Sequence, residues 1–153
     1  MKLKSQVLVL AVVALGCLCA TVYAGTRTPS AEGATVSFAN LSDGDVVQPS
    51  FVVRFTISGM GIAPAGTQID NTGHFHLLID LPDPPNFDQP LPVNEHIRHY
   101  GKGQTQVELD LAEGQHTLQL LLADYAHVPH DPPVMSKVVK IVVSQDAPPQ
   151  TEN

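Results

Sequence analysis

The chain has 153 residues, which is enough for one domain with a hydrophobic core of its own. Its formal net charge is −7 and its lysines and arginines form no basic patch, which argues against a surface for nucleic acid or anionic membranes. Both cysteines, Cys17 and Cys19, lie near the amino terminus, so the rest of the sequence has no disulfide, thiolate zinc site or cysteine nucleophile.

Residues 1–24 have the pattern of a cleaved secretory signal peptide. Two lysines precede an apolar run at 7–20, and Val22-Tyr23-Ala24 fits the small-x-small rule for signal peptidase. We expect cleavage after Ala24 and export to the periplasm or the extracellular space. The remaining chain then has six basic and 15 acidic residues and a formal charge of about −9.

Two other fates of this segment stay open. One is an uncleaved membrane anchor, although the apolar run is short for a transmembrane helix and no basic cluster follows it. The other is a lipoprotein modified at Cys17, because the preceding Ala14-Leu15-Gly16 loosely resembles a lipobox. With cleavage after Ala24, the mature chain keeps no stable membrane span.

Composition also sets the limits of the folded domain. Residues 25–33 are small and polar and predict a flexible lead, and residues 144–153 predict a disordered tail. The domain between them covers residues 34–143.

Within this domain, apolar and polar residues alternate with the period of a β-strand. In the segment 51–58, for example, Phe51, Val53 and Phe55 share one face. The segments with β character are 34–39, 51–58, 73–80, 105–111, 116–125 and 134–143. No segment keeps a helical period for ten residues. We therefore predict an all-β domain, an immunoglobulin-like β-sandwich of about seven strands.

Histidines are the residues that carry candidate chemistry. There are seven of them, at positions 74, 76, 96, 99, 116, 127 and 130. His74 and His76 are two apart on a predicted strand, so their side chains point to the same face while Phe75 points to the core. Such a pair can converge on one metal ion with bonds of about 2.0–2.1 Å. The alternative is a solvent-facing or cross-strand packed pair.

A second pair follows the strand 116–125, in the sequence His127-Val128-Pro129-His130-Asp131-Pro132-Pro133. The prolines restrict the residues before them to extended geometry, which predicts a rigid loop. This loop either presents two imidazoles to a metal or is a structured turn with a capping aspartate.

A third pair, His96 and His99, follows a long proline-rich loop at 81–93. Long ordered loops often have functional roles. Of the two, His99 is the stronger candidate ligand, and both are otherwise surface residues. We assign His116 to the structure of the domain, as a core histidine, because it shares one face of a strand with leucines that point to the core.

We expect these segments to meet at one end of the sandwich. The candidate metal ligands are His74, His76, His99, His127 and His130, flanked by Asp80, Asp124 or Asp131. Neutral imidazole suits zinc, copper and nickel, and two methionines in the mature chain are too few for a methionine-rich Cu(I) site.

Three motifs, GHFHLLID, GKGQTQ and LQLLLADYAHVPHDPPVMS, together resemble a bacterial family of secreted domains of unknown function. Proteins of this family are often mislabelled as rod-shape-determining proteins. The resemblance covers about residues 70–143. It implies three consecutive histidines before LLID, where this chain has Phe75 in the middle position. It points to the same short set of histidines and implies no activity.

Three classes of function follow. The first is an exported domain that binds copper or zinc through the clustered histidines. The second is a metal-free interaction module that binds a peptide, glycan or partner protein through the loop 81–95. An enzyme is the least favoured, because the sequence has no nucleophile elbow, HExxH motif or phosphate-binding glycine loop, and Glu95 is the one conceivable base. No partner protein can be named from the sequence.

Overall fold

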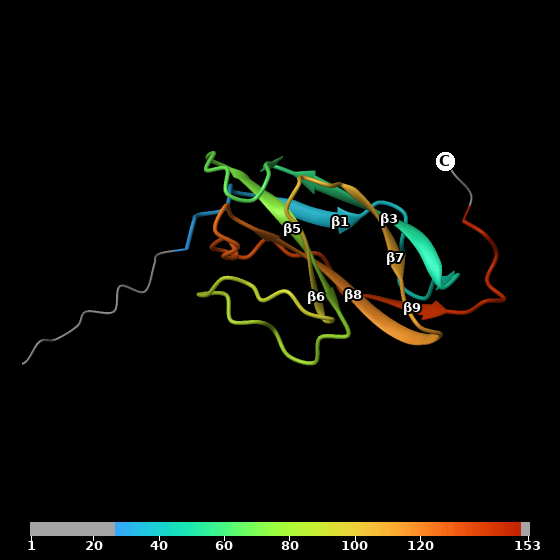
Figure 1. Cartoon of the computed structure of the whole chain (residues 1–153). Coiled ribbons are helices and arrows are strands. Elements are labelled where there is room, and N and C mark those ends of the chain that lie inside the picture. The colour runs from blue at the N-terminus through green and yellow to red at the C-terminus, as the bar shows by residue number, and fades with distance from the viewer. Residues whose placement is uncertain (1–26, 151–153) are drawn as a thin grey trace, which may run out of the picture.

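The strands form two sheets that pack face to face, with the alternating apolar residues between them (Figure 1). The structure is a computed structural model that describes residues 27–150, and the predicted signal peptide lies outside the described residues. The strands are β1 (Thr35–Phe38), β2 (Val46–Val47), β3 (Ser50–Ser58), β4 (Gly61–Ile62), β5 (Thr72–Ile79), β6 (Ile97–Tyr100), β7 (Gln106–Asp110), β8 (Gly114–Ala123) and β9 (Val139–Val143). One sheet has the order β1-β3-β7 and the other β2-β9-β8-β5-β4, with β6 also paired to β5.

This architecture confirms the predicted all-β, immunoglobulin-like sandwich. The described part of the chain has nine strands rather than about seven. Alternation did not predict β2, β4 and β6, because these strands have two, two and four residues and are too short to show it. Between residues 27 and 150, no helix is long and apolar enough to cross a membrane.

The main core lies between the two sheets and takes one face of each long strand. Phe51, Val53 and Phe55 of β3 are buried, as their alternation predicts. Phe75 and Leu77 of β5 face them, and the ring centroids of Phe55 and Phe75 are 5.0 Å apart. Burying side chains of this size stabilises the fold by about 1.5–3 kcal/mol each.

A second apolar layer covers the outer face of the larger sheet. Leu78 of β5, Ile97 of β6 and Leu121 of β8 form one buried cluster with Leu91 of the loop that joins β5 to β6. This loop lies alongside β5, β6 and β8 in Figure 1. His74, His76 and Leu78 of β5 therefore face a covered, low-dielectric layer instead of solvent.

The last predicted strand, 134–143, is shorter than its composition indicates. Only β9 forms a continuous ladder with β8. Before β9, the backbone N–H of Leu120 donates to the hydroxyl oxygen of Ser136 at 2.9 Å. A side-chain hydroxyl thus takes the place of a backbone carbonyl, and the regular ladder is interrupted there.

Parts of the predicted lead and tail pack against the domain. The N–H of Ser30 donates to the carbonyl of Asp131 at 3.0 Å, and the N–H of Asp131 donates to the carbonyl of Thr28 at 2.9 Å. In the predicted tail, Ala147 is only 6 % exposed. Hydrogen bonds thus hold residues 28–30 against the domain, and burial of Ala147 places this part of the tail against it.

Candidate metal centre

Three histidines project together from the outer face of the larger sheet. His74 and His76 are two residues apart on β5, and the strand period puts both on the side opposite Phe75. β6 runs antiparallel to β5 with His99 directly opposite His76. Residues paired in this way have Cβ atoms about 4.5–5.5 Å apart, so the three rings form a triangle on the sheet.

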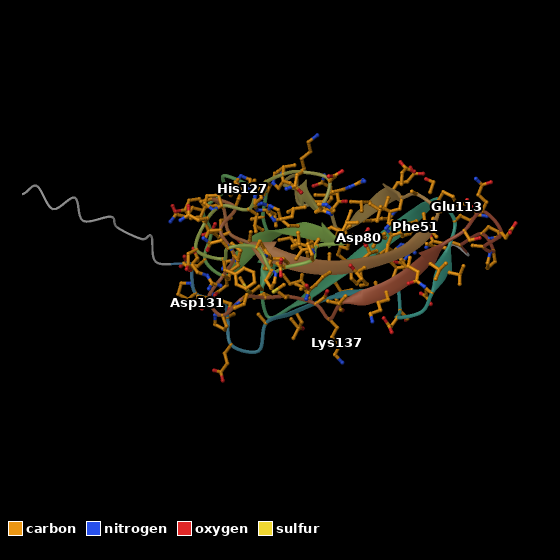
Figure 2. All side chains as sticks on the ribbon, turned by 90° about the horizontal axis from the view of Figure 1, so that it is seen from below. Phe51, Asp80, Glu113, His127, Asp131 and Lys137 are labelled. Atoms are coloured by element: carbon orange, nitrogen blue, oxygen red, sulfur yellow. The ribbon has the colours of Figure 1, made fainter. Side chains whose placement is uncertain are left out.

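The fourth histidine, His127, reaches the triangle from the loop after β8. Its backbone has a φ of 67°, a left-handed conformation that is uncommon for residues other than glycine. Such a conformation persists only where the surroundings hold it, and functional sites are enriched in it. Figure 2 shows His127 and Asp131 at one end of the sandwich and Glu113 at the opposite end.

Asp124 holds the loop of His127 in this conformation. Its carboxylate is nearly buried and accepts hydrogen bonds from the N–H groups of Ala126 at 2.9 Å and Val128 at 3.0 Å. The Thr28 hydroxyl donates to its other oxygen at 2.6 Å. The long β5–β6 loop also contributes, because the N–H of Leu91 donates to the carbonyl of His127 at 2.9 Å.

The four rings are close enough to share one ion. We call His74, His76, His99 and His127 the four-histidine cluster. Each offers one ring nitrogen, and these four atoms all lie within 4.8 Å of one another. Nε2 of His74 and Nδ1 of His127 are 3.2 Å apart. Nitrogens bound to one tetrahedral ion at about 2.0–2.1 Å would be about 3.3 Å apart, so modest rotations of the rings would complete the coordination.

Several of these nitrogens are buried and have no protein partner. His74 and His76 are fully buried. Both nitrogens of His76, Nδ1 of His74 and Nε2 of His99 lack a hydrogen-bond partner within the described part of the chain. A buried polar atom without a partner costs about 1–3 kcal/mol. A bound metal ion would supply a partner for one nitrogen of each ring.

The surroundings keep the rings of His74, His76 and His99 neutral. Burial, and then the neighbouring histidines His99 and His127, lower the pKa of His74 to about 4. Burial followed by His74 lowers the pKa of His76 to about 3. Burial also lowers the pKa of His99. At pH 7 these imidazoles therefore keep a free lone pair, which is the form that binds metal ions.

Gly101 is a further residue of the site that the sequence reasoning did not identify. A Cβ atom at this position would lie 2.3 Å from two ring atoms of His99. Only a glycine leaves room for the ring of His99 in its present position. The sequence signal was the Tyr-Gly that follows His99, but strand alternation alone does not predict where a ring two residues earlier will lie.

The fifth predicted ligand, His130, does not join the four-histidine cluster. It is fully buried, its Nδ1 lies 3.3 Å from the carbonyl oxygen of Thr28, and its Nε2 has no partner. This Nε2 would be 3.0 Å from a Cβ atom at Gly73, so His130 packs against the start of β5.

The remaining histidines have structural contacts. Nδ1 of His96 is 2.9 Å from the carbonyl oxygen of Ile79. Nδ1 of His116 is 2.6 Å from a carboxylate oxygen of Asp80, which agrees with its assignment to structure, although its side chain is at the strand start and not in the core. Phe75, in the middle of the motif, belongs to the main core. A third histidine there would point away from the cluster.

Among residues 27–150, no carboxylate joins the four-histidine cluster. Of the three predicted flanking aspartates, Asp80 binds His116, Asp124 caps the loop of His127, and Asp131 lies 3.6 Å from the guanidinium of Arg27. The donor set is four imidazoles.

Comparison with known proteins identifies the family. Residues 53–144 match the family described as Domain of unknown function (DUF4399), and the chain belongs to it. This range includes every member of the four-histidine cluster. No match was found among curated proteins or among solved structures. The expected membership of a family of uncharacterised domains is confirmed.

Proposed function

We propose that this member of the DUF4399 family binds one divalent transition-metal ion, zinc or copper, through the four-histidine cluster. The observation that carries the proposal is the convergence of four imidazoles, two of them fully buried, in which ring nitrogens of His74, His76 and His99 have no hydrogen-bond partner among the described residues. A core built for stability alone would have apolar side chains here, because unpaired buried nitrogens reduce stability. A bound metal ion would coordinate one nitrogen of each ring and so remove the cost of leaving those nitrogens unpaired.

The proposed role is to hold the ion and not to perform chemistry on it. Structural zinc sites use four protein ligands, whereas catalytic sites keep one position open for water or substrate. Four imidazoles fill a tetrahedral shell. Metal-assisted hydrolysis is therefore less well supported than binding, storage or transfer of the ion. The signal-peptide pattern at 1–24 supports a location outside the cytoplasm.

The alternative function, an interaction module acting through the loop 81–95, has less support. Leu91 of this loop is buried in the outer apolar cluster, and Leu81 and Phe87 pack against it. Val93 is its one large apolar side chain that is highly exposed, at 67 %. The loop thus uses its apolar residues to cover the sheet and to hold the His127 loop.

The test is calorimetric titration of residues 25–153 with Zn(II) and Cu(II) at pH 7. We expect one saturable site in the wild type and loss of that site in the His74→Ala/His76→Ala variant. His96→Ala is the matched control, because His96 lies outside the cluster and is expected to leave binding unchanged. Absence of binding tighter than millimolar for both metals would refute the proposal.

A further inference from the structure

We infer that the four-histidine cluster is built for a tetrahedral ion and selects Zn(II) over ions that prefer a square plane. This inference rests on the proposed function and adds the identity of the metal. It follows from the arrangement of the four rings, from how the backbone fixes them, and from the chemistry of the donors.

The distances between ring centroids fit a tetrahedron. Four imidazoles bound tetrahedrally, with bonds of about 2.0–2.1 Å, have all six centroid pairs about 5.2 Å apart. The six observed distances are 4.9 Å (His74–His76), 4.9 Å (His74–His99), 5.0 Å (His74–His127), 5.0 Å (His76–His99), 6.0 Å (His76–His127) and 4.7 Å (His99–His127).

A square plane would give a different pattern. It has four short centroid distances of about 4.5 Å and two diagonals of about 6.4 Å, and the two diagonals share no ring. The one long distance here, 6.0 Å, joins His76 and His127. In a square plane the remaining two rings, His74 and His99, would form the second diagonal, but their centroids are only 4.9 Å apart. The cluster therefore has no pair of diagonals.

The backbone resists flattening of the cluster. His74, His76 and His99 stand on one sheet, on strands held by the β5–β8 and β5–β6 ladders. His127 comes from a loop outside that sheet and is held by Asp124. Three ligands from one surface and a fourth above them form a pyramid. Moving all four into one plane would require breaking a ladder or releasing the loop.

The donor chemistry agrees with this geometry. Zn(II) has no geometric preference from its d electrons, and it accepts imidazole readily. Cu(II) and Ni(II) prefer tetragonal arrangements, and Cu(I) prefers thiolate or thioether sulfur, which the cluster lacks. Cu(II) binds most unconstrained nitrogen sites more tightly than Zn(II). A rigid tetrahedral site reduces that advantage.

The experiment uses Co(II) as a spectroscopic probe of the coordination geometry. Tetrahedral Co(II) absorbs visible light far more strongly than octahedral Co(II), and zinc displaces it from a shared site. We expect the protein of residues 25–153 to give the strong visible bands with one equivalent of Co(II). One equivalent of Zn(II) is expected to abolish them, whereas one equivalent of Ni(II) is expected to leave most of the intensity.

The variant His127→Ala tests the fourth ligand. With only the three histidines of the sheet, Co(II) would add water ligands, so we expect weak bands at the same metal occupancy. His96→Ala is expected to keep the wild-type spectrum. Weak octahedral bands in the wild type, or a His127→Ala spectrum as strong as the wild type, would overturn the inference while leaving metal binding intact. If none of these metals bound to the protein, both proposals would be overturned.

Discussion

His76 shows most clearly how the site differs from an ordinary core. Its ring is fully buried, and neither nitrogen has a partner. Its pKa is lowered to about 3, mainly by burial, so the ring is neutral across the physiological range. An apolar side chain of similar size would fill the same space without two desolvated nitrogens. Stability alone therefore does not explain a histidine at this position, whereas the proposed metal binding does.

We expect His76→Leu to make the metal-free protein as stable as the wild type or more stable by about 1 kcal/mol, because the variant removes unpaired buried nitrogens. Urea unfolding in the presence of a chelator measures this difference. The same variant is expected to lose Zn(II) binding. If the metal-free variant were instead less stable by several kcal/mol, the ring of His76 would stabilise the fold as a core side chain. The argument from its unpaired nitrogens would then fail.

Gly101 gives a second prediction for a single residue. Alanine at this position would place a methyl group 2.3 Å from ring atoms of His99, so the ring must rotate away from the cluster. We expect Gly101→Ala to lower zinc affinity by about 10–100-fold, the effect usual for residues that orient metal ligands. Competition with a chromophoric chelator measures the affinity.

Gly61→Ala is the matched control for this variant. Gly61 lies on the short strand β4, and a Cβ atom there would have only an ordinary contact, 3.4 Å from a methyl group of Thr72. Both variants add one methyl group to the same region of the fold. Equal losses of affinity in the two would mean that the position of the His99 ring does not matter.

The loop between β8 and His130 is the element on which the fourth ligand depends. Asp124 accepts hydrogen bonds from Ala126 and Val128, which bracket His127, and another from Thr28. A charge-assisted hydrogen bond of this kind contributes about 1.5–3 kcal/mol. The affinity of the site should therefore depend on a residue that does not bind the metal.

We expect Asp124→Ala to weaken zinc binding by about 10–100-fold, because the loop of His127 is released while the three histidines of the sheet remain. Circular dichroism is expected to keep its β-sheet spectrum. The control is Asp131→Ala, since Asp131 is exposed and carries only a long ion pair with Arg27. Wild-type affinity in the Asp124 variant would show that the loop conformation is set elsewhere.

Local rules predict part of this site and not the rest. The pairing of His74 and His76 on one face follows from the strand period, and so does the burial of Phe75 on the other. The position of His99 beside His76 depends on the register between β5 and β6, which pairs the two residues. Register is set by contacts between distant segments, so no local pattern shows it.

The loop that follows β8 was harder to predict. His127 and His130 are three residues apart in the same motif, yet only His127 joins the cluster. An irregular loop has no repeating geometry to fix side-chain directions, and the left-handed residue at His127 turns the two apart. The fold itself was predictable because alternation recurs along most of the domain, and only the strands β2, β4 and β6, of two, two and four residues, escaped it.

At the scale of the molecule, the buried histidines should make the metal-free protein sensitive to acid. The pKa values of His74 and His76 are lowered to about 4 and about 3, below the value of 6.5 expected in an unfolded chain. At pH values between about 4 and 6.5, the unfolded chain binds more protons than the folded one. The free energy of unfolding therefore falls as the pH falls from 6.5 toward 4.

The contribution of one histidine can be isolated by comparison with His76→Leu. One proton taken up only by the unfolded chain changes stability by about 1.4 kcal/mol per pH unit. We expect the wild type to lose stability more steeply than the variant by about this amount between pH 6 and pH 4, in urea unfolding with a chelator present. Parallel slopes would mean that His76 titrates normally in the folded protein.

The proposed zinc binding is the central claim at all three scales, and X-ray absorption at the zinc edge tests it most directly. The sample is the protein of residues 25–153, loaded with one equivalent of Zn(II) and desalted. We predict retained zinc with four nitrogen neighbours at about 2.0–2.1 Å and the outer-shell scattering of imidazole rings. Loss of the metal on desalting, or a six-coordinate shell of oxygen atoms, would contradict a closed four-histidine zinc site.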